Sequence, residues 1–338
     1  MTVGYVIRRL GLFVLIAVVA FSLNFLIPHM LPGDPIRERF TTLQGHGGAY
    51  KADIEAIVAE YERRFGFDQP LWKQYINYWS DILRGDLGQS ASHFPAEVTH
   101  LLRITLPWSV GLLMTATVIS FSVGTIFGAL LSWPAMPRSF RGGLTATVPV
   151  LMVAAAIPSF LIGIVLVFFF VIIWQFFPGG RGIAIGVEVG MNWESIISII
   201  DHAFLPAMAM VLASSGLYAL TMRGMMVTVM GEDYITLAKA KGLRGPRIFL
   251  WYALRSAMLP QATAFALSVG HIVTGSILVE TVFAYPGVGS LLFESVKTND
   301  FFVIQGIAVI LILTTATALL IMDLLYPWID PRIKVSQA

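Results

Sequence analysis

The sequence contains no cysteine and little charge, and each absence excludes classes of protein. Of its 338 residues, 12% are charged and 57% are hydrophobic, whereas an ordinary soluble domain is roughly 25% charged. So few charges cannot cover a soluble protein of this length, and so apolar a chain does not stay disordered. The absence of Cys excludes a disulfide framework, a thiolate nucleophile and a Cys metal site. The composition predicts a polytopic membrane protein.

Motifs for nucleotide binding and covalent chemistry are missing too. No G-x-x-x-x-G-K-[ST] loop occurs, so we do not expect this chain to hold ATP phosphates itself. No G-x-S-x-G or H-E-x-x-H motif occurs, and the six His lack metal-ligand spacing. The formal charge of +2 is too balanced to favour a nucleic-acid partner. We therefore expect no enzyme, an intramembrane hydrolase included, and no metal or cofactor in this chain.

Charge-free runs locate the membrane spans, because an ionised side chain in hydrocarbon is energetically costly. A helix needs about 20 residues to cross a bilayer. The third long run could hold two spans, but Pro149, Pro158 and the turn at Pro178 favour one long kinked helix. The sequence thus predicts an all-α protein with six transmembrane helices. The six runs are residues 10–33, 104–137, 142–180, 202–222, 256–279 and 301–322.

The distribution of Lys and Arg predicts the orientation of these spans. With six spans, one side holds both termini and the loops 134–143 and 223–255, which together contain 12 Lys and Arg. The opposite side is more acidic, and most of its basic residues lie in one long loop, whose charge influences topology little. Both termini are therefore predicted to be cytoplasmic. We interpret the first run as a retained helix, because no small-residue cleavage site follows it.

The external stretch 31–103 is too long for a simple connection. Apolar residues recur at helical spacing over 54–65 and again over 71–83, which predicts two amphipathic helices too short to span. We expect Leu71, Trp72, Tyr75 and Trp79 to face the spans or the bilayer. Two interpretations stay open for this region, an anchor on the bilayer surface and a platform for an external partner.

The cytoplasmic loop 223–255 is the densest basic segment of the chain, with six Lys and Arg. Positive-inside loops are basic in any case, so charge alone says little more about it. However, Glu232 and Asp233 suit a helix N-terminus, Ala and Lys are good helix formers, and Gly242 suits a helix end. This order predicts a short helix on the inner face.

Short sequence islands in a fixed order carry a resemblance to a known family. They are LPGDP at 31–35, GDLGQS at 85–90, AKAKGL at 238–243 with ALRSAMLP at 253–260, ETVFAYPGVG at 280–289, and DPR at 330–332. Together they resemble the permeases of ABC importers, in the dipeptide/oligopeptide/nickel branch and of the first-permease type. Thr236 and Leu237 depart from the Glu-Ala of other ABC importers, and Ser256 stands where the branch has Asn.

The resemblance implies a type I permease fold in the bacterial inner membrane. It also implies a heterodimer with a second permease, two ATP-binding subunits inside that hold ATP and Mg²⁺, and a solute-binding protein outside. The helix in the loop 223–255 would then dock in a cleft of an ATPase and couple its motion to the spans. The residues assigned to this coupling are Asp233, Tyr234, Ala238, Lys239, Ala240, Lys241, Gly242 and Leu243.

Peptides are the expected cargo, and oligosaccharides are the alternative, because the segment 177–202 resembles relatives assigned to longer peptides or oligosaccharides. An ion-coupled secondary transporter is the alternative of a different class. It would require an intramembrane relay or an inverted repeat. We find no convincing repeat and one clear intramembrane acid, Asp323, for which a structural role near the cytoplasmic end is the favoured interpretation.

Candidate residues for a gate or for the solute path lie near the fifth run. His271 is a polar residue inside this run, although packing is its more ordinary role. Glu280 either anchors the adjacent Pro-Gly turn or lines an external gate. Tyr285, Pro286 and Gly287 form that turn.

The predicted organisation has four parts. An N-terminal transmembrane helix covers 1–30, and the external amphipathic region covers 31–103. A five-helix permease core covers 104–330 and includes the coupling loop 223–255, and a cytoplasmic tail covers 331–338.

Overall fold

A computed structural model describes residues 3–30, 68–134, 136–270 and 277–329. All regular elements in these ranges are helices, and the only other pairing there is an isolated bridge between Gln89 and Glu97. The predicted all-α class is confirmed. The predicted amphipathic helix at 54–65 lies outside the described residues.

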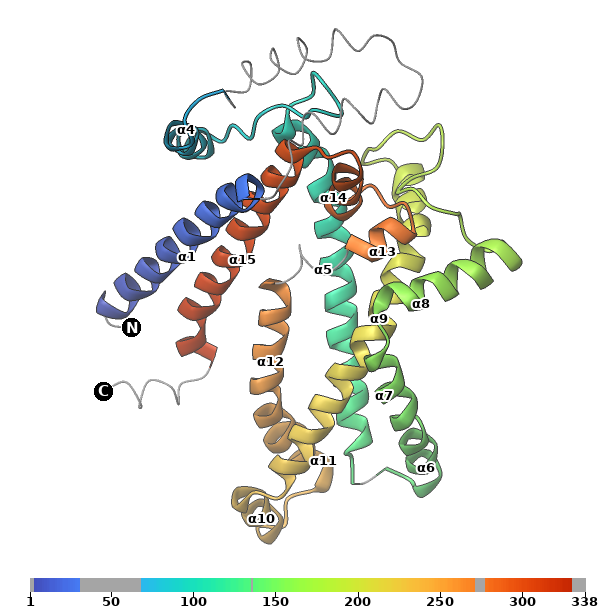
Figure 1. Cartoon of the computed structure of the whole chain (residues 1–338). Helices are drawn as coiled ribbons and strands as arrows, with labels where there is room; N and C mark the ends of the chain where they lie inside the picture. The colour runs from blue at the N-terminus through green and yellow to red at the C-terminus, as the bar shows by residue number, and fades with distance from the viewer. Residues whose placement is uncertain (1–2, 31–67, 135, 271–276, 330–338) are drawn as a thin grey trace.

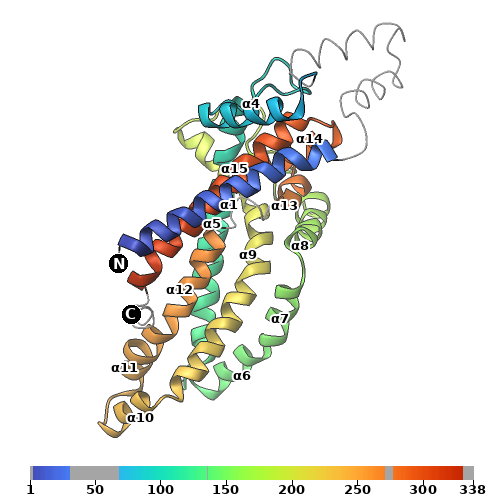
Figure 2. The same ribbon diagram turned by 60° about the vertical axis from the view of Figure 1, so that its left-hand side comes forward.

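Four long apolar helices form the frame of the molecule (Figure 1). They are α1 (Val3–Met30), α5 (Val98–Leu131), α9 (Trp193–Met230) and α15 (Phe301–Ile329). Each contains one of the predicted charge-free runs or most of it, because an α-helix satisfies all its backbone groups inside a bilayer. Helices α1 and α15 lie side by side in both views (Figures 1 and 2).

Close approach of α5 and α9 depends on glycine. A Cβ atom at Gly124 would come 2.6 Å from the Cβ of Tyr218. A Cβ atom at Gly128 would collide with the carbonyl oxygen of Ala219. Lipid gives no hydrophobic drive for helix association, so close backbone contact at small residues holds such helices together.

The long third run is broken more sharply than the predicted kink. It forms α6 (Arg138–Ala146), α7 (Val148–Ala156), α8 (Ser159–Leu166) and the π-helical η1 (Val167–Ile173). The two halves of this segment meet at 103°. Proline disfavours the helical conformation of the residue before it, and Ile157 is accordingly extended, with φ −86° and ψ 125°.

Short helices occupy the two ends of the frame. At one end lie α4 (Leu71–Arg84) and α14 (Val288–Lys297), and at the other end lies α10 (Asp233–Ala240) (Figures 1 and 2). From α10 the chain runs through α11 (Gly245–Arg247) and the π-helical η2 (Ile248–Leu254) into α12 (Arg255–Gly270). The helix predicted for 71–83 is therefore present as α4.

The described residues contain four helices that are long and apolar enough to span a membrane, or five with the bent pair α7–α8. The remaining predicted span, 256–279, corresponds to α12 and the short α13 (Ile277–Val282), with residues 271–276 between them outside the described ranges. A membrane protein with several apolar spans is confirmed, while the count of six stays a prediction.

Candidate functional site

The helix predicted in the cytoplasmic loop is present as α10. It begins at Asp233, whose carboxylate favours the positive end of the helix dipole, and it is preceded by Glu232 in an extended conformation. After its end, Gly242 adopts a left-handed conformation with φ +74°. The Leu243 N–H donates to the Ala238 carbonyl at 3.3 Å, which satisfies an end group of the helix. The predicted acidic start and glycine end are both observed.

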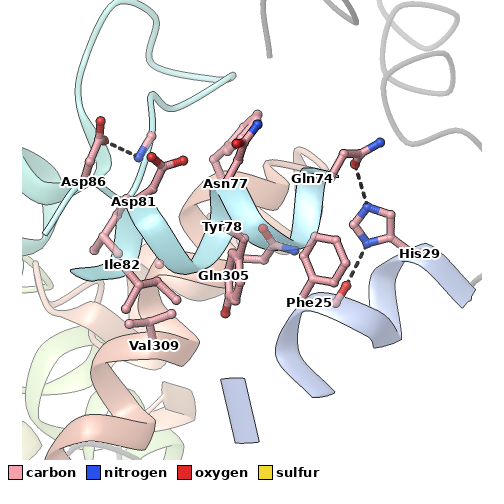
Figure 3. A pocket seen from close by; sticks show the side chains of 14 residues that line it. Phe25, His29, Gln74, Asn77, Tyr78, Asp81, Ile82, Asp86, Gln305 and Val309 are labelled. Atoms are coloured by element: carbon pink, nitrogen blue, oxygen red, sulfur yellow. Dashed lines mark hydrogen bonds between the residues drawn. The ribbon is translucent and has the colours of Figure 1, made fainter. Parts of the chain in front are cut away.

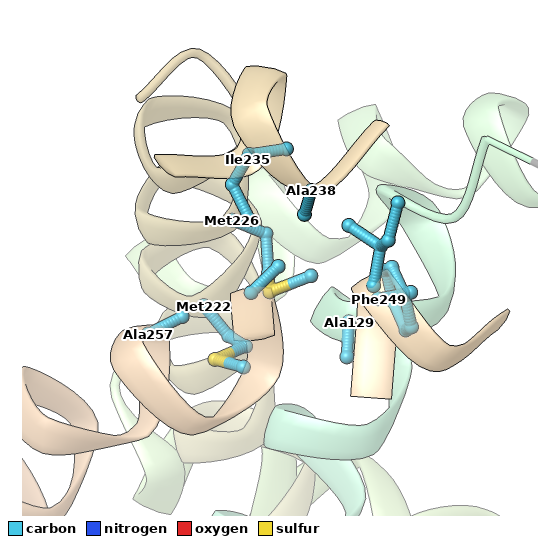
Figure 4. Close-up of a cluster of buried hydrophobic side chains, with 9 residues drawn as sticks. Ala129, Met222, Met226, Ile235, Ala238, Phe249 and Ala257 are labelled. Carbon is cyan, nitrogen blue, oxygen red and sulfur yellow. The ribbon is translucent and has the colours of Figure 1, made fainter. Parts of the chain in front are cut away.

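The inner side of α10 is locked into the core. Ile235 and Ala238 are 0% and 3% exposed, and they pack with Met222 and Met226 of α9 and Phe249 of η2 (Figure 4). Apolar contacts this well buried resist independent movement of the parts that make them. Helix α10 is therefore a rigid extension of α9 and η2.

A second contact ties the end of α5 to the same cluster. The indole ring of Trp133, just after α5, stacks on Phe249 with ring centroids 5.1 Å apart and planes 9° apart. Because η2 continues directly into α12, a displacement of α10 acts on α5, α9 and α12 together. This connection is the mechanical property that a coupling helix needs.

The other side of α10 is exposed in the described part of the chain. Tyr234 and Leu237 are 38% and 56% exposed, and Trp251 of the neighbouring η2 is 70% exposed. Exposed aromatic and aliphatic side chains with basic neighbours are typical of a protein-docking surface. Of the other predicted coupling residues, Ala238 is buried and Leu243 is half-buried. The exposed ones are Asp233, Lys239, Ala240, Lys241 and Gly242.

The predicted gate residue Glu280 is a buried anchor of the turn at Tyr285, Pro286 and Gly287, which we call the outer turn after its predicted orientation. Its carboxylate accepts a hydrogen bond from the Ser109 hydroxyl of α5 at 2.7 Å and another from the Gly289 N–H at 2.7 Å. The Ser109 Oγ in turn accepts from the Val288 N–H at 2.8 Å. A buried carboxylate needs such partners, since leaving it unpaired is costly. Of the two interpretations left open for Glu280, the geometry favours anchoring of the turn.

The turn itself is packed against α5. Tyr285 is 2% exposed and meets the Trp108 ring edge-to-face, with centroids 5.7 Å apart. Burial, and then the nearby Glu280 carboxylate, raise the pKa of Tyr285 to about 12. A Cβ atom at Gly287 would collide with the Glu280 carboxylate and the Ser109 hydroxyl, so only glycine fits there. Pro286 is half-buried.

The predicted site residues therefore fall into two groups, at opposite ends of the frame. The coupling residues gather on α10, and Glu280, Tyr285, Pro286 and Gly287 gather at the outer turn with Ser109, which the sequence did not single out. His271 lies outside the described residues. The gate assignment of the outer-turn residues stays a prediction.

A further polar cluster at the outer end was missed from the sequence. Asp300, just before α15, is 0% exposed and accepts hydrogen bonds from the Ser90 hydroxyl at 2.6 Å and from the Ser92 N–H at 2.7 Å. Burial raises the pKa of Asp300, but the hydrogen bonds from Ser90, Ser92 and the Ala91 backbone outweigh it, so the net shift is downward. The cluster ties the GDLGQS island to the start of the last span.

Helix α4 lies across the outer ends of α1 and α15, over a small cavity of about 140 Å³ (Figure 3). Asn24 of α1 donates to the Tyr78 hydroxyl of α4 at 3.0 Å and to the Gln305 carbonyl of α15 at 3.3 Å. Tyr75 and Trp79 face α1 as predicted. Leu71 and Trp72 are 58% and 64% exposed, so the described residues leave most of each side chain uncovered. Their contact with the bilayer stays a prediction.

The chain is similar to known transport proteins over nearly its whole length. Residues 124–335 match the family model described as binding-protein-dependent transport system inner membrane component. The probable D,D-dipeptide transport system permease protein DdpB of Escherichia coli K12 is 32% identical, with 96% of each chain covered. The oligopeptide transport system permease protein AppB of Bacillus subtilis is 32% identical, with 98% of this chain and 99% of the relative covered. The dipeptide transport system permease protein DppB of Escherichia coli K12 is 30% identical, with 98% of each covered.

Proposed function

Because the chain belongs to the family of binding-protein-dependent transport system inner membrane components, we propose that it is the pore-forming permease subunit of an ABC importer for di- and oligopeptides. The names of its relatives as dipeptide and oligopeptide transport permeases support peptides as the cargo. Oligosaccharides, the alternative cargo, have no such support. Family membership also makes an ion-coupled secondary transporter the weaker hypothesis.

The observation that carries this proposal is the two-sided character of α10. Ile235 and Ala238 fasten the helix to α9 and η2, while Tyr234 and Leu237 stay exposed on its other side. A helix that is fixed on one side and open on the other transmits the movement of a docked partner into the spans. We assign this role to α10 and its neighbours, with the partner being an ATP-binding subunit.

The full complex that we propose contains a second, homologous permease, two ATP-binding subunits and an external solute-binding protein. ATP and Mg²⁺ would be held by the ATP-binding subunits. The end of the molecule that carries α10 would be cytoplasmic, together with both termini, because it contains the densest basic segment of the chain. The end that carries α4, α14 and the outer turn would be external.

For the chain as a whole, we propose the type I permease fold with six spans and the four-part organisation set out above. The fifth span in chain order would consist of α12, the segment 271–276 and the start of α13. The region 31–103, which contains α4, would be an external insertion at the mouth of the pore. Charge reversal at exposed residues of α4, such as Lys73, would distinguish the two interpretations of this region, a platform for a partner and an anchor on the bilayer.

Affinity purification of the tagged chain in mild detergent tests the class of protein. We expect two ATP-binding subunits and a second permease to co-purify at fixed stoichiometry, with ATPase activity stimulated by a solute-binding protein. A matched preparation of the Leu237→Asp variant should lose the ATP-binding subunits and retain the second permease. Purification of the wild-type chain without any ATPase would refute the proposal.

The cargo is tested separately, by uptake of labelled di- and oligopeptides into proteoliposomes that contain the complete complex. We expect ATP-dependent uptake of peptides and none of a maltooligosaccharide of similar size. The opposite preference would replace peptides by oligosaccharides and leave the class of transporter unchanged.

A further inference from the structure

A cavity of about 410 Å³ lies between α5, α7, α9 and α12, halfway along the two longest helices. Its volume is within the roughly 300–1,000 Å³ typical of small-molecule sites. Half of its lining residues carry a hydroxyl group, and the described lining contains no Asp, Glu, Lys, Arg or His. The hydroxyl-bearing residues are Thr117, Ser120, Ser214, Tyr218, Thr221 and Ser268.

Four of these hydroxyl groups are engaged by the protein itself. Ser120, Thr221 and Ser268 donate to carbonyl oxygens four residues earlier in their own helices, at 2.7 to 2.9 Å. Tyr218 donates to Ser268 at 2.7 Å. Thr117 and Ser214 have no hydrogen-bond partner among the described residues. Their hydroxyl groups are thus available to a molecule that enters the cavity.

The position of the cavity argues against lipid as its normal occupant. A hydroxyl group that faces acyl chains without a hydrogen-bond partner is unfavourable, yet Thr117 and Ser214 both line this concavity without such a partner among the described residues. On the opposite face of α9, at the same depth, the exposed residue is apolar: Leu212 is 43% exposed there. A flat contact with a second permease would not need a hollow of this volume. Water or a polar solute suits it best.

We propose that this cavity is part of the path along which the cargo crosses the membrane, and that Thr117 and Ser214 hydrogen-bond the peptide backbone. The inference rests on the proposed function for the identity of the cargo. A hydroxyl group both donates and accepts, so it matches the N–H and C=O groups that every peptide residue presents. A lining without charge gives no preference for acidic, basic or neutral side chains. This chain therefore contributes a path that is indifferent to peptide sequence.

Accessibility to water is the first test, and because this chain has no native Cys, the introduced Cys is the only one that it contributes. In the complete complex, the Thr117→Cys and Ser214→Cys variants should react with a small, charged methanethiosulfonate at least tenfold faster than their matched controls. The controls are Thr115→Cys and Leu212→Cys, each two residues away on the opposite face of the same helix and outside the cavity lining. Saturating peptide during ATP turnover should slow the reaction of the two cavity variants only. Equal rates in variants and controls would mean that lipid or the second permease covers this face, and would overturn the inference.

Transport is the second test. Thr117→Val keeps the shape of the side chain and removes the hydroxyl, and we expect it to lower peptide uptake roughly two- to tenfold, the value of one ordinary hydrogen bond. The decrease should be similar for acidic, basic and neutral dipeptides, with unchanged complex yield, and Thr115→Val should transport normally. A decrease confined to one charge class, or none at all, would contradict the assignment of Thr117.

The two tests separate this inference from the proposed function. If the complex proves to carry another solute, peptide uptake fails for the wild type, while the faster labelling of Thr117→Cys and Ser214→Cys still identifies a water-filled path. If the labelling rates match those of the controls while the wild type imports peptides, the path inference fails and the proposed function stands.

Discussion

Arg9 and Asp323 join the first and the last long helix, with the guanidinium Nη1 2.7 Å from the carboxylate Oδ2. The Tyr5 hydroxyl donates to the backbone carbonyl of Asp323 at 2.8 Å, so two contacts hold the same turns of α1 and α15 together. This pairing agrees with the structural role favoured for Asp323, and its partner comes from α1. It leaves Asp323 paired and thus poorly suited to a proton relay.

Breaking this pair should loosen the contact between α1 and α15 without abolishing transport. Both side chains are about one-third exposed, so we expect Arg9→Gln to cost about 0.2–1 kcal/mol. The measurement is thermal unfolding of the purified complex for each single variant and for the exchanged pair Arg9→Asp with Asp323→Arg. Recovery of stability in the exchanged pair identifies the ion pair as the cause. Loss of uptake in Asp323→Asn at normal stability would instead indicate a functional acid.

The outer turn should tolerate no side chain at Gly287. A methyl group there would meet the Glu280 carboxylate and the Ser109 hydroxyl, and overpacking of this kind typically costs about 1–3 kcal/mol. We expect Gly287→Ala to lower the stability of the complex and to expose the turn to limited proteolysis. Gly111→Ala on α5 is the control, because nothing lies within 4 Å of its added Cβ atom. Equal stability of the two variants would show that the packing around Glu280 is loose.

Acid should weaken the contacts that the Asp300 carboxylate makes with Ser90 and Ser92 just before α15. Its pKa is lower in the folded protein than the usual value of about 3.9 for an Asp. The unfolded state therefore binds the proton more readily, and the stability that Asp300 contributes is fully present above about pH 4 and is lost as pH falls through the folded pKa. Unfolding between pH 3 and pH 6 should show this loss in the wild type and less of it in Asp300→Asn. Ser90→Ala removes one hydrogen bond that lowers the folded pKa of Asp300, so it should make the acid-dependent loss smaller and end it at a higher pH.

Orientation follows from the opposite positions of α4 and α10 (Figure 1). In sealed cells, the Leu83→Cys variant should react with an impermeant thiol reagent, because Leu83 is 80% exposed at the end we assign to the outside. The Gly245→Cys variant should react only after the cells are opened. Reaction of Gly245→Cys from outside would invert the topology and with it the assignment of α10 to the ATPases.

The sequence was sufficient to predict features that depend on neighbouring residues. The long helices follow from charge-free runs, and α10 follows from an acidic start at Asp233 and a glycine at 242. Such signals are local, because helix ends and apolar length act within a few residues. A kink at Pro158 was predicted on the same basis, and the structure has a sharper break there.

Features that join distant segments could not be predicted in this way. The 103° angle at Pro158 depends on what each half packs against, and Gly163 of α8 lies against the Phe283 ring from beyond α13. Ser109 is an unremarked hydroxyl in an apolar run, and its role depends on Glu280, 171 residues later. The stack of Trp133 on Phe249 is of the same kind. Contacts at these separations leave no periodic signal in one sequence.

The last prediction concerns the end of α10 and separates backbone conformation from space. Gly242 and Gly245 lie in the same loop, and an added Cβ atom at either would meet nothing within 4 Å, but only Gly242 has a positive φ, +74°. An L-residue in that conformation costs about 1–2 kcal/mol, so Gly242→Ala should shift the helix end, whereas Gly245→Ala should change little. The shift would displace Lys241 and its exposed neighbours from a docked ATPase. We therefore expect Gly242→Ala to reduce the peptide uptake per ATP hydrolysed. Gly242→Trp should release the ATPase altogether. Gly242→Asn should recover part of the coupling, since Asn visits the left-handed region more readily. Identical coupling ratios in Gly242→Ala and Gly245→Ala would remove the conformational argument for including Gly242 in the docking surface.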